Sequence, residues 1–203
     1  IGGIDIKYGK ELGINISLEK LRSEYDAVYL AYGVGLARQL NIPGEDLSGV
    51  VDALKFIYDI RNDGYKSVSV GDEVVVIGMG MTAIDAATQA KRLGAASVTM
   101  VYRRTQEEMP CTEHELNIAK LDGCKIIWLA APIEVIGENG QIKEVVFDEM
   151  ALSEPDASGR RSPVKNGATF SLKADMLIKA AGQIPFEALN DSMTLDHNDG
   201  KII

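Results

Sequence analysis

One stretch of the chain, residues 73–104, restricts the possible folds more than any other. It begins with residues 74–77, an all-β-branched run that is typical of a strand buried on both faces of a parallel sheet. A turn with two glycines follows, then a helix with small residues at helical spacing, and then a second apolar run at 97–101. This is the order of a dinucleotide-binding βαβ unit. The sequence therefore predicts an α/β fold, a Rossmann-like domain with a central parallel sheet.

The turn reads Gly78-Met79-Gly80-Met81-Thr82-Ala83. Gly78 permits a tight turn out of the strand, and Gly80 has no side chain to keep a pyrophosphate away from the backbone. Ala83 is small enough for close packing of helix on strand. The helix that begins here presents free N–H groups and a positive dipole end to an anion. We expect these six residues to bind the pyrophosphate of a nucleotide. The alternative is a doubly wound sheet whose glycines serve packing alone.

Two adjacent arginines, Arg103 and Arg104, follow the second strand of this unit. An NAD site usually has an acid at this point, which accepts a hydrogen bond from the ribose 2′-OH, and no acid stands here. Guanidinium groups can bind a 2′-phosphate through paired hydrogen bonds, so the pair predicts NADP(H) rather than NAD(H). The alternative is a solvated pair that Glu107 and Glu108 neutralise.

The chain is acidic, with a net charge of −9 over 203 residues. This charge argues against nucleic acid and against an anionic membrane surface as partners. No apolar run approaches the roughly 20 residues that span a bilayer, and the first residues do not read as a signal peptide. Cys111 and Cys124 form no C-x-x-C motif, and His114 and His197 stand apart from any ligand-like cluster. We therefore expect no metal site, and two reduced structural thiols in a cytoplasmic protein.

Periodicity and turn residues predict the remaining elements. Helices are expected after the N-cap candidate Ser17, at 50–61 and at 113–122. Single strands are expected at 4–8, 27–31, 125–129 and 175–182. An antiparallel meander is expected from strands at 133–136, 143–149 and 168–172, with a turn at 138–140 joining the first two. Residues 35–49 and 152–167 read as loops.

Two of these strands share one pattern, an Asp, an apolar run and a Gly. Asp26 precedes Gly33 by seven residues, and Asp175 precedes Gly182 by seven. The two strands bracket the βαβ unit, as they would in a domain inserted into another domain. The chain has no initial Met and ends in residues that read as an unfinished strand, so we read it as a piece of a longer protein.

Several motifs together resemble one known family. They are YDAVYLAYG at 25–33, NIPGE at 41–45, the glycine turn, VYRRT at 101–105, EMP at 108–110 and AGQ at 181–183. The combination is similar to the glutamate synthase small-subunit group of FAD-dependent pyridine nucleotide oxidoreductases. That group also holds the flavin half of dihydropyrimidine dehydrogenase and NADPH-dependent ferredoxin reductase subunits. The resemblance covers nearly the whole chain and is specific to the group rather than to one member.

The resemblance implies an NADPH domain inserted into a split FAD domain, with hydride passing from NADPH to FAD and electrons leaving through iron–sulfur clusters on other segments. Residues 78–83 would hold the pyrophosphate and Arg103 and Arg104 the 2′-phosphate, while Gly182 and Gln183 would lie near the nicotinamide. The NADP(H)-binding domain would be residues 37–183, and residues 1–36 and 184–203 would be pieces of the FAD domain. The partners would be the remaining FAD and iron–sulfur segments and a large catalytic subunit.

The chain also departs from the family pattern. The family commonly has Gly at the position of Met79 and Asn or Asp at that of Met81, so we expect two bulky side chains beside the phosphate turn. The FAD fingerprint and the cluster-binding cysteines are absent from this chain, which should therefore hold no FAD and be inactive by itself. No catalytic acid–base set stands out. Two alternatives stay open: a dihydropyrimidine dehydrogenase-type reductase module, and a non-catalytic NADP(H)-binding sensing or structural module.

The split-domain reading has a consequence for the ends of the chain. Apolar edges such as residues 27–31 would have been built to pair with strands of the longer protein, and an exposed apolar strand favours association. We expect the isolated chain either to form a homodimer through these edges or to leave them poorly ordered.

Overall fold

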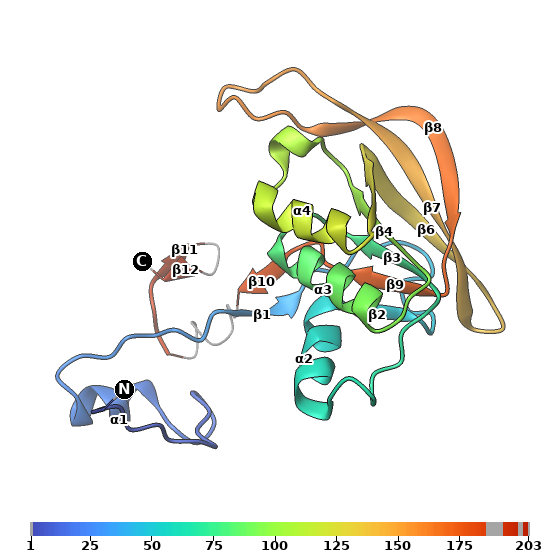
Figure 1. The fold of residues 1–203 in the computed structure, drawn as a ribbon. Helices are drawn as coiled ribbons and strands as arrows, with labels where there is room; N and C mark the ends of the chain where they lie inside the picture. Colours follow the sequence, from blue (N-terminus) through green and yellow to red (C-terminus); the bar gives the residue numbers. More distant parts are fainter. Residues whose placement is uncertain (1, 186–192, 199–200, 203) are drawn as a thin grey trace. The chain divides into compact units, whose positions relative to one another are not determined.

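The computed structural model describes residues 2–185, 193–198 and 201–202, which belong to two compact units. The larger unit comprises residues 37–182, and the smaller unit comprises the described residues of 1–36 and 183–203. Figure 1 shows the helices and strands of the chain, coloured in sequence order. The predicted glycine turn and arginine pair fall in the larger unit.

The larger unit is built on a five-stranded parallel sheet with the order β2-β9-β3-β4-β5. The strands are β2 (Val50–Asp52), β3 (Glu73–Ile77), β4 (Ser97–Tyr102), β5 (Lys125–Trp128) and β9 (Met176–Lys179). The helices are α2 (Ala53–Asp63), α3 (Met81–Arg92) and α4 (Glu113–Leu121). The predicted strand–turn–helix–strand unit is therefore confirmed as β3, α3 and β4. Because β3 is central, its turn lies in the middle of the carboxyl edge of the sheet.

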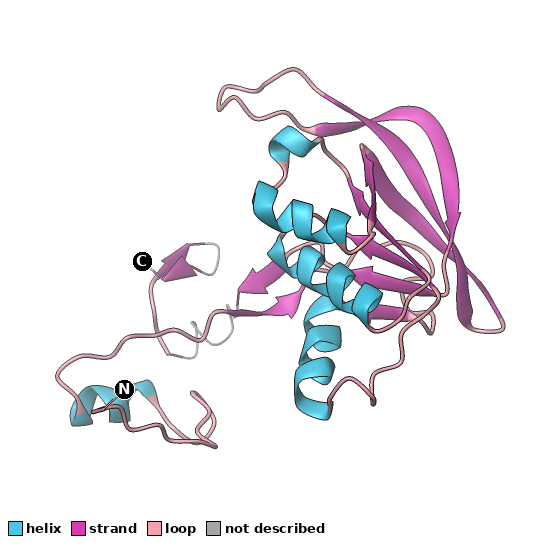
Figure 2. Ribbon diagram, in the orientation of Figure 1, coloured by secondary structure: helices cyan, strands magenta, loops and turns pink. Residues whose placement is uncertain are grey.

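Alternate residues of β3 are buried on opposite faces of this sheet. Val74 and Val76 belong to the core formed with the helices, whereas Val75 and Ile77 belong to the core formed with an antiparallel sheet. Figure 2 shows the helices on one side of the parallel strands and the antiparallel sheet on the other. This arrangement explains the continuous β-branched run, since neither face of β3 meets water. On the helix side the fully buried alanines of α3, such as Ala83 and Ala87, let the helix lie close to the sheet.

The antiparallel sheet has the strand order β6-β7-β8, formed by β6 (Ala130–Glu138), β7 (Gln141–Leu152) and β8 (Pro163–Lys173). The predicted meander is thus confirmed, as is its turn, in which Asn139 and Gly140 take positive φ values of 53° and 78°. Phe147 is fully buried and stacks on Phe170 at 5.2 Å between ring centroids. Such a pair contributes about 0.5–1.5 kcal/mol beyond its burial.

Two predictions for the larger unit are wrong in part. Residues 50–52 form a strand rather than the start of a helix, because the β-branched Val50 and Val51 pair with β9. Asp52 then begins α2, since its carboxylate accepts hydrogen bonds from Leu54 N and Lys55 N. Residues 163–167 are strand rather than loop, because β7 is longer than predicted and offers them partners beyond a bulge near Met150.

The described residues of the smaller unit form one helix and short strands. The helix α1 (Leu18–Glu24) confirms the prediction, with Ser17 Oγ accepting a hydrogen bond from Lys20 N. The strands β1 (Val34–Ala37) and β10 (Gln183–Pro185) pair with each other, and β11 (His197–Asn198) pairs with β12 (Lys201–Ile202).

The strands predicted at 4–8 and 27–31 are wrong: neither segment forms a strand. A strand requires a neighbour for its backbone hydrogen bonds, and among the described residues neither segment has one. Tyr29, in the middle of the second segment, is 92% exposed. The assignment of residues 1–36 and 184–203 to a split FAD domain stays a prediction, and residues 1, 186–192, 199–200 and 203 of these ranges lie outside the described residues.

Candidate nucleotide-binding cleft

A cleft of about 680 Å³ opens in the larger unit at the carboxyl ends of β3, β4 and β9. It is lined by Arg38–Leu40, Ile77–Gly80, Val101–Arg104, Pro110, Ala130–Pro132, Arg160 and Ala180–Gly182. In open α/β sheets, ligands bind outside the carboxyl ends of the strands, because the helix N-termini and the loops meet there. A cleft of this size at this position can accommodate a nucleotide.

The two glycines of the turn have different reasons for being glycine. Gly78 has φ +129°, and a Cβ at this position would lie 2.3 Å from the carbonyl oxygen of Ala180. The fold itself therefore requires Gly78. Gly80 has φ −84° and ψ 174°, which any residue can adopt, and its Cβ would meet only Pro110 Cγ, at 3.9 Å. Packing among the described residues therefore does not require Gly80, whose missing side chain leaves room in the cleft.

The sequence predicts two bulky side chains beside the phosphate turn, and the structure places the two methionines differently relative to the cleft. Met79 is 1% exposed, since its side chain is part of the core beneath the helices, and its carbonyl oxygen accepts a hydrogen bond from Cys111 N. Met81 is the first residue of α3 and is 63% exposed, but it does not line the cleft. Gly80, the N-cap of this helix, has no side chain that could accept a hydrogen bond from the first amides. These amides can therefore donate hydrogen bonds to a bound anion.

Of the remaining residues predicted to bind the nucleotide, Gly182 lines the cleft, whereas Thr82, Ala83 and Gln183 do not. Ala83 is fully buried against the sheet and Thr82 is half-buried in the first turn of α3, and neither lines the cleft. Gly182 does line it, with φ +109° and its carbonyl oxygen accepting a hydrogen bond from Arg38 N. Gln183 lies in β10, in the smaller unit, and is not part of the cleft.

The cleft concentrates positive charge. Arg38, Arg103, Arg104 and Arg160 line it, and none of its lining residues is an acid. In a chain with a net charge of −9, this local excess of guanidinium groups favours a polyanionic ligand. The Nε of Arg104 is buried and has no hydrogen-bond partner among the described residues. A buried donor of this kind could donate its hydrogen bond to an anionic ligand.

Two sets of side-chain interactions stabilise the turn that follows the arginine pair. Tyr102 donates a hydrogen bond to the carbonyl oxygen of Glu108, and its ring meets Trp128 edge-on at 6.2 Å. The Thr105 and Glu108 side chains form a capping box at the start of η1 (Gln106–Glu108). The Glu108 carboxylate thereby accepts hydrogen bonds within its own turn, and the neutralisation of the arginine pair by Glu107 and Glu108 stays an open alternative.

A buried ion pair fixes the cleft wall formed by Arg38–Leu40. Lys179 Nζ, at the end of β9, donates to Gln39 Oε1 at 2.6 Å and to Glu45 Oε1 at 2.9 Å. The Glu45 carboxylate also accepts hydrogen bonds from Leu40 N and Asn41 N, both at 2.7 Å. Burial alone would raise the pKa of Glu45, but these hydrogen bonds and the lysine outweigh it and hold the pKa below its usual value.

We expect Glu45→Gln to lower the free energy of unfolding by about 2 kcal/mol at pH 7, because Lys179, only 8% exposed, loses its counter-charge. Since the folded pKa is lowered, this contribution is complete above the unfolded pKa of about 4.3 and is lost as the pH falls through the folded value. The gap between wild type and variant should therefore close in acid. Urea unfolding at a series of pH values measures it.

The matched control is Glu138→Gln, which breaks the exposed pair with Lys143 and should change stability far less than Glu45→Gln does. A gap for Glu45→Gln that stayed constant from neutral pH into strong acid would contradict an ionised Glu45 as its cause.

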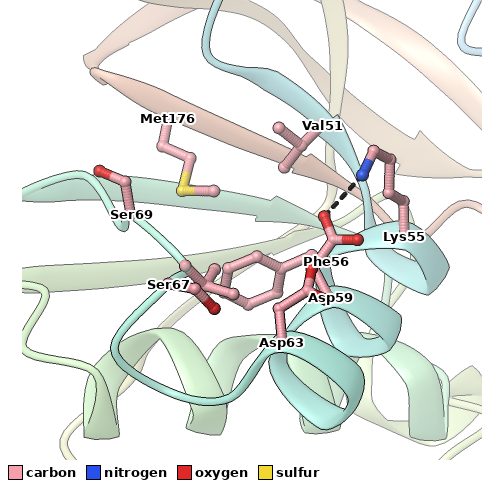
Figure 3. Close-up of a pocket in the computed structure, with 9 residues that line it drawn as sticks. Val51, Lys55, Phe56, Asp59, Asp63, Ser67, Ser69 and Met176 are labelled. Atoms are coloured by element: carbon pink, nitrogen blue, oxygen red, sulfur yellow. Dashed lines mark hydrogen bonds and ion pairs between the residues drawn. The ribbon is translucent and has the colours of Figure 1, made fainter.

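A second cavity, of about 260 Å³, lies beside α2 and is drawn in Figure 3. Its charged groups are Lys55, Asp59 and Asp63, and the ammonium of Lys55 already pairs with Asp59 at 2.6 Å. This leaves a net negative lining, which does not suit a nucleotide.

Both cysteines of the chain lie in the larger unit. Cys111 and Cys124 are free and buried, as predicted, and burial raises the pKa of the Cys124 thiol to about 11. Among the described residues, no group of three or more His, Cys, Asp or Glu side chains could hold a metal ion. No helix in the described part of the chain has the length and apolar composition needed to cross a bilayer.

The parallel sheet, the glycine turn at its carboxyl edge and the antiparallel sheet on its second face define a Rossmann-like fold. Residues 3–203 match the family model for pyridine nucleotide-disulphide oxidoreductases. The chain belongs to that family, and the resemblance expected from the sequence is confirmed.

The chain is 38% identical to the NADPH-Fe(3+) oxidoreductase subunit beta of Geobacter sulfurreducens, over 96% of this chain and 30% of that protein. It is 36% identical to the glutamate synthase [NADPH] small chain of Halomonas elongata, over 92% of this chain and 41% of that protein. The chain thus spans less than half the length of these curated relatives.

Among solved structures, FprA from Mycobacterium tuberculosis in complex with NADPH aligns with a TM-score of 0.69 at 23% identity. The alignment covers 95% of this chain and 59% of FprA. At this identity, the likeness supports the fold alone.

Proposed function

We propose that the larger unit is the NADPH-binding domain of a flavin-dependent oxidoreductase. The observation that carries the proposal is the cleft at the carboxyl edge of the parallel sheet, with four arginines and no acid among its lining residues. NADPH carries a pyrophosphate and a 2′-phosphate, and these charges match that lining. The names of relatives that include NADPH, among them the two described above, support the same choice.

The proposed roles of the residues follow from their positions. The backbone of the glycine turn, residues 78–83, and the first amides of α3 would bind the pyrophosphate, with Gly80 leaving room for it. Arg103 and Arg104 would bind the 2′-phosphate, and the unpartnered Nε of Arg104 is suited to this. Gly182 and Gln183 would lie on the nicotinamide side, where the chain crosses back from the larger unit.

The chemistry of hydride transfer needs positioning rather than an acid–base set in this chain. FAD, held by the longer protein, would supply the hydride acceptor. The residues of this chain would bind the nucleotide and fix its orientation, and the Lys179–Glu45 pair would hold the cleft wall in place.

The wider assembly is also part of the proposal. Residues 1–36 and 184–203 would complete a split FAD domain together with segments of the longer protein, and iron–sulfur clusters would accept the electrons. The name of one relative, glutamate synthase small chain, makes a large catalytic subunit a candidate partner. The free, buried thiols fit the proposed cytoplasmic location. If this chain is isolated, its exposed residues such as Tyr29 favour self-association.

The reading as a non-catalytic sensing module loses its main support. That reading depended on Met79 and Met81 obstructing the phosphate turn, but Met79 is buried in the core and Met81 does not line the cleft.

Comparing this chain with the longer protein tests the proposal. The purified 203-residue chain is expected to be colourless and to show no NADPH oxidase activity, because the FAD fingerprint is absent from it. The longer protein is expected to be yellow and to lose its flavin absorbance within one turnover when NADPH is added anaerobically. A yellow preparation of the isolated chain would contradict the domain assignment. A longer protein that binds NADPH but keeps its flavin oxidised would favour the sensing module.

A further inference from the structure

The loop between β7 and β8 brings a basic side chain to the cleft that the sequence motifs do not contain. Arg160 lines the cleft together with Arg103 and Arg104, although it lies 56 residues after Arg104. In Figure 1 this loop extends from the antiparallel sheet back over the chain that leads into α4. The loop of the antiparallel sheet therefore contributes a cationic group to the cleft.

The loop holds the backbone of Arg160 in a defined position. The carboxylate of Asp156 accepts hydrogen bonds from Arg160 N at 3.0 Å and from Ser158 N at 2.8 Å. Asp156 N donates to the carbonyl oxygen of Arg160 at 2.9 Å, and Gly159 turns the chain between them with φ +81°. The ends of the loop are joined by a hydrogen bond from Ser153 N to the carbonyl oxygen of Ser162, at 2.8 Å. Arg160 is thus presented by an ordered turn rather than by a free tail.

The loop lies at the end of the cleft where Arg103 and Arg104 stand. Glu108, in the turn after these arginines, has a lowered pKa because of its hydrogen bond with Thr105, and the positive charge of the nearby Arg161 contributes to the lowering. The neighbour of Arg160 in the loop is therefore close to the turn that follows the arginine pair. This places the loop near the part of the cleft that is proposed for the 2′-phosphate.

We propose that Arg160 is a third ligand of the 2′-phosphate of NADP(H), reaching it from the β7–β8 loop. The inference rests on the proposed function of the cleft. Arg104 follows a strand of the parallel sheet and Arg160 lies in a loop of the antiparallel sheet, so the phosphate dianion would be held by guanidinium groups from two different sheets. NADH has a hydroxyl group at this position, so Arg160 would have no charge to bind there and would act as a determinant of the choice between the two nucleotides.

Calorimetric titration of the 203-residue chain with NADPH and with NADH tests the assignment. Arg160→Ala is expected to weaken NADPH binding about ten-fold, which is about 1.4 kcal/mol, and to leave NADH binding unchanged. Arg160→Lys keeps the charge but loses the planar fork, so an intermediate loss is expected. The matched control is Arg161→Ala, because Arg161 is adjacent but does not line the cleft and binds Ser153 O instead. Circular dichroism confirms that each variant is folded.

The outcomes separate this inference from the one on which it rests. If wild type binds no NADPH, the proposed function fails and this inference fails with it. If wild type binds NADPH and Arg160→Ala binds it equally well, the inference alone is overturned. An equal loss for NADPH and NADH would also overturn it, because Arg160 would then act on a part that the two nucleotides share.

Discussion

Gly78→Ala is expected to leave the larger unit largely unfolded, whereas Gly80→Ala is expected to fold normally and to lose NADPH binding. A Cβ at Gly78 would lie 2.3 Å from the carbonyl oxygen of Ala180, and the residue would have to keep φ +129°. Backbone strain and overpacking each cost about 1–3 kcal/mol, and their sum is a large part of the roughly 5–15 kcal/mol that stabilises a domain.

Gly80 provides the matched comparison two residues away. Its backbone is in an extended conformation, and the added methyl would meet only Pro110 Cγ at an ordinary distance of 3.9 Å. Stability should therefore change by no more than about 1 kcal/mol, because alanine is only a poorer N-cap than glycine. The methyl would project into the space proposed for the pyrophosphate, and we expect NADPH affinity to fall at least about ten-fold.

Thermal unfolding and nucleotide titration of both variants separate the two roles. A stable Gly78→Ala protein would contradict the close approach of β3 to Ala180. A Gly80→Ala protein that binds NADPH as wild type does would show that the phosphate approaches the chain elsewhere.

The double variant Arg103→Ala/Arg104→Ala is expected to lose NADPH binding by about two orders of magnitude or more while keeping its fold. Each hydrogen bond from a guanidinium to a phosphate contributes about 1.5–3 kcal/mol, and both arginines lie on the surface of the cleft rather than in either core. Binding of NADH should change far less, because it lacks the 2′-phosphate. Titration with both nucleotides measures the two losses.

Arg61→Ala is the control for this variant, since Arg61 is an exposed residue in the last turn of α2, outside the cleft. It removes one positive charge from the chain without touching the site. If the double variant weakened NADPH and NADH to the same extent, the arginines would serve the pyrophosphate or the general field of the cleft, and the assignment to the 2′-phosphate would be wrong.

The βαβ unit could be predicted from the sequence because its signals are local. The β-branched run of β3, the two glycines and the alanines of α3 each report on their own element, and together they fix the order of the elements. The meander was predicted for the same reason, through its Asn139–Gly140 turn. Residues 50–52 were misread because a β-branched start and an apolar helix pattern overlap there, and only the pairing with β9 decides between them.

The residues that line the cleft could be predicted only in part, because some of them are far apart in the sequence and are brought together by the fold. Arg103 and Arg104 follow a strand in a recognisable motif, but Arg38 and Arg160 reach the cleft from loops that no local pattern connects to it. The side chain of Met79 was misjudged for a related reason. Its neighbours on the chain are glycines, but its contacts are with the core, which the sequence does not place.

The strands predicted at 4–8 and 27–31 show that a strand-like sequence pattern does not ensure that a strand forms. Their patterns are those of strands, yet among the described residues they have no neighbours with which to pair. Pattern predicts the capacity to form a strand, and pairing decides whether the strand forms.

The most direct test of the central claim is the ratio of the affinities of the wild-type chain for NADPH and NADH, measured by calorimetry in one buffer of low ionic strength. The account predicts that NADPH binds at least about ten-fold more tightly, because the arginines of the cleft have a 2′-phosphate to bind only in that nucleotide. Equal affinities, or tighter binding of NADH, would contradict it.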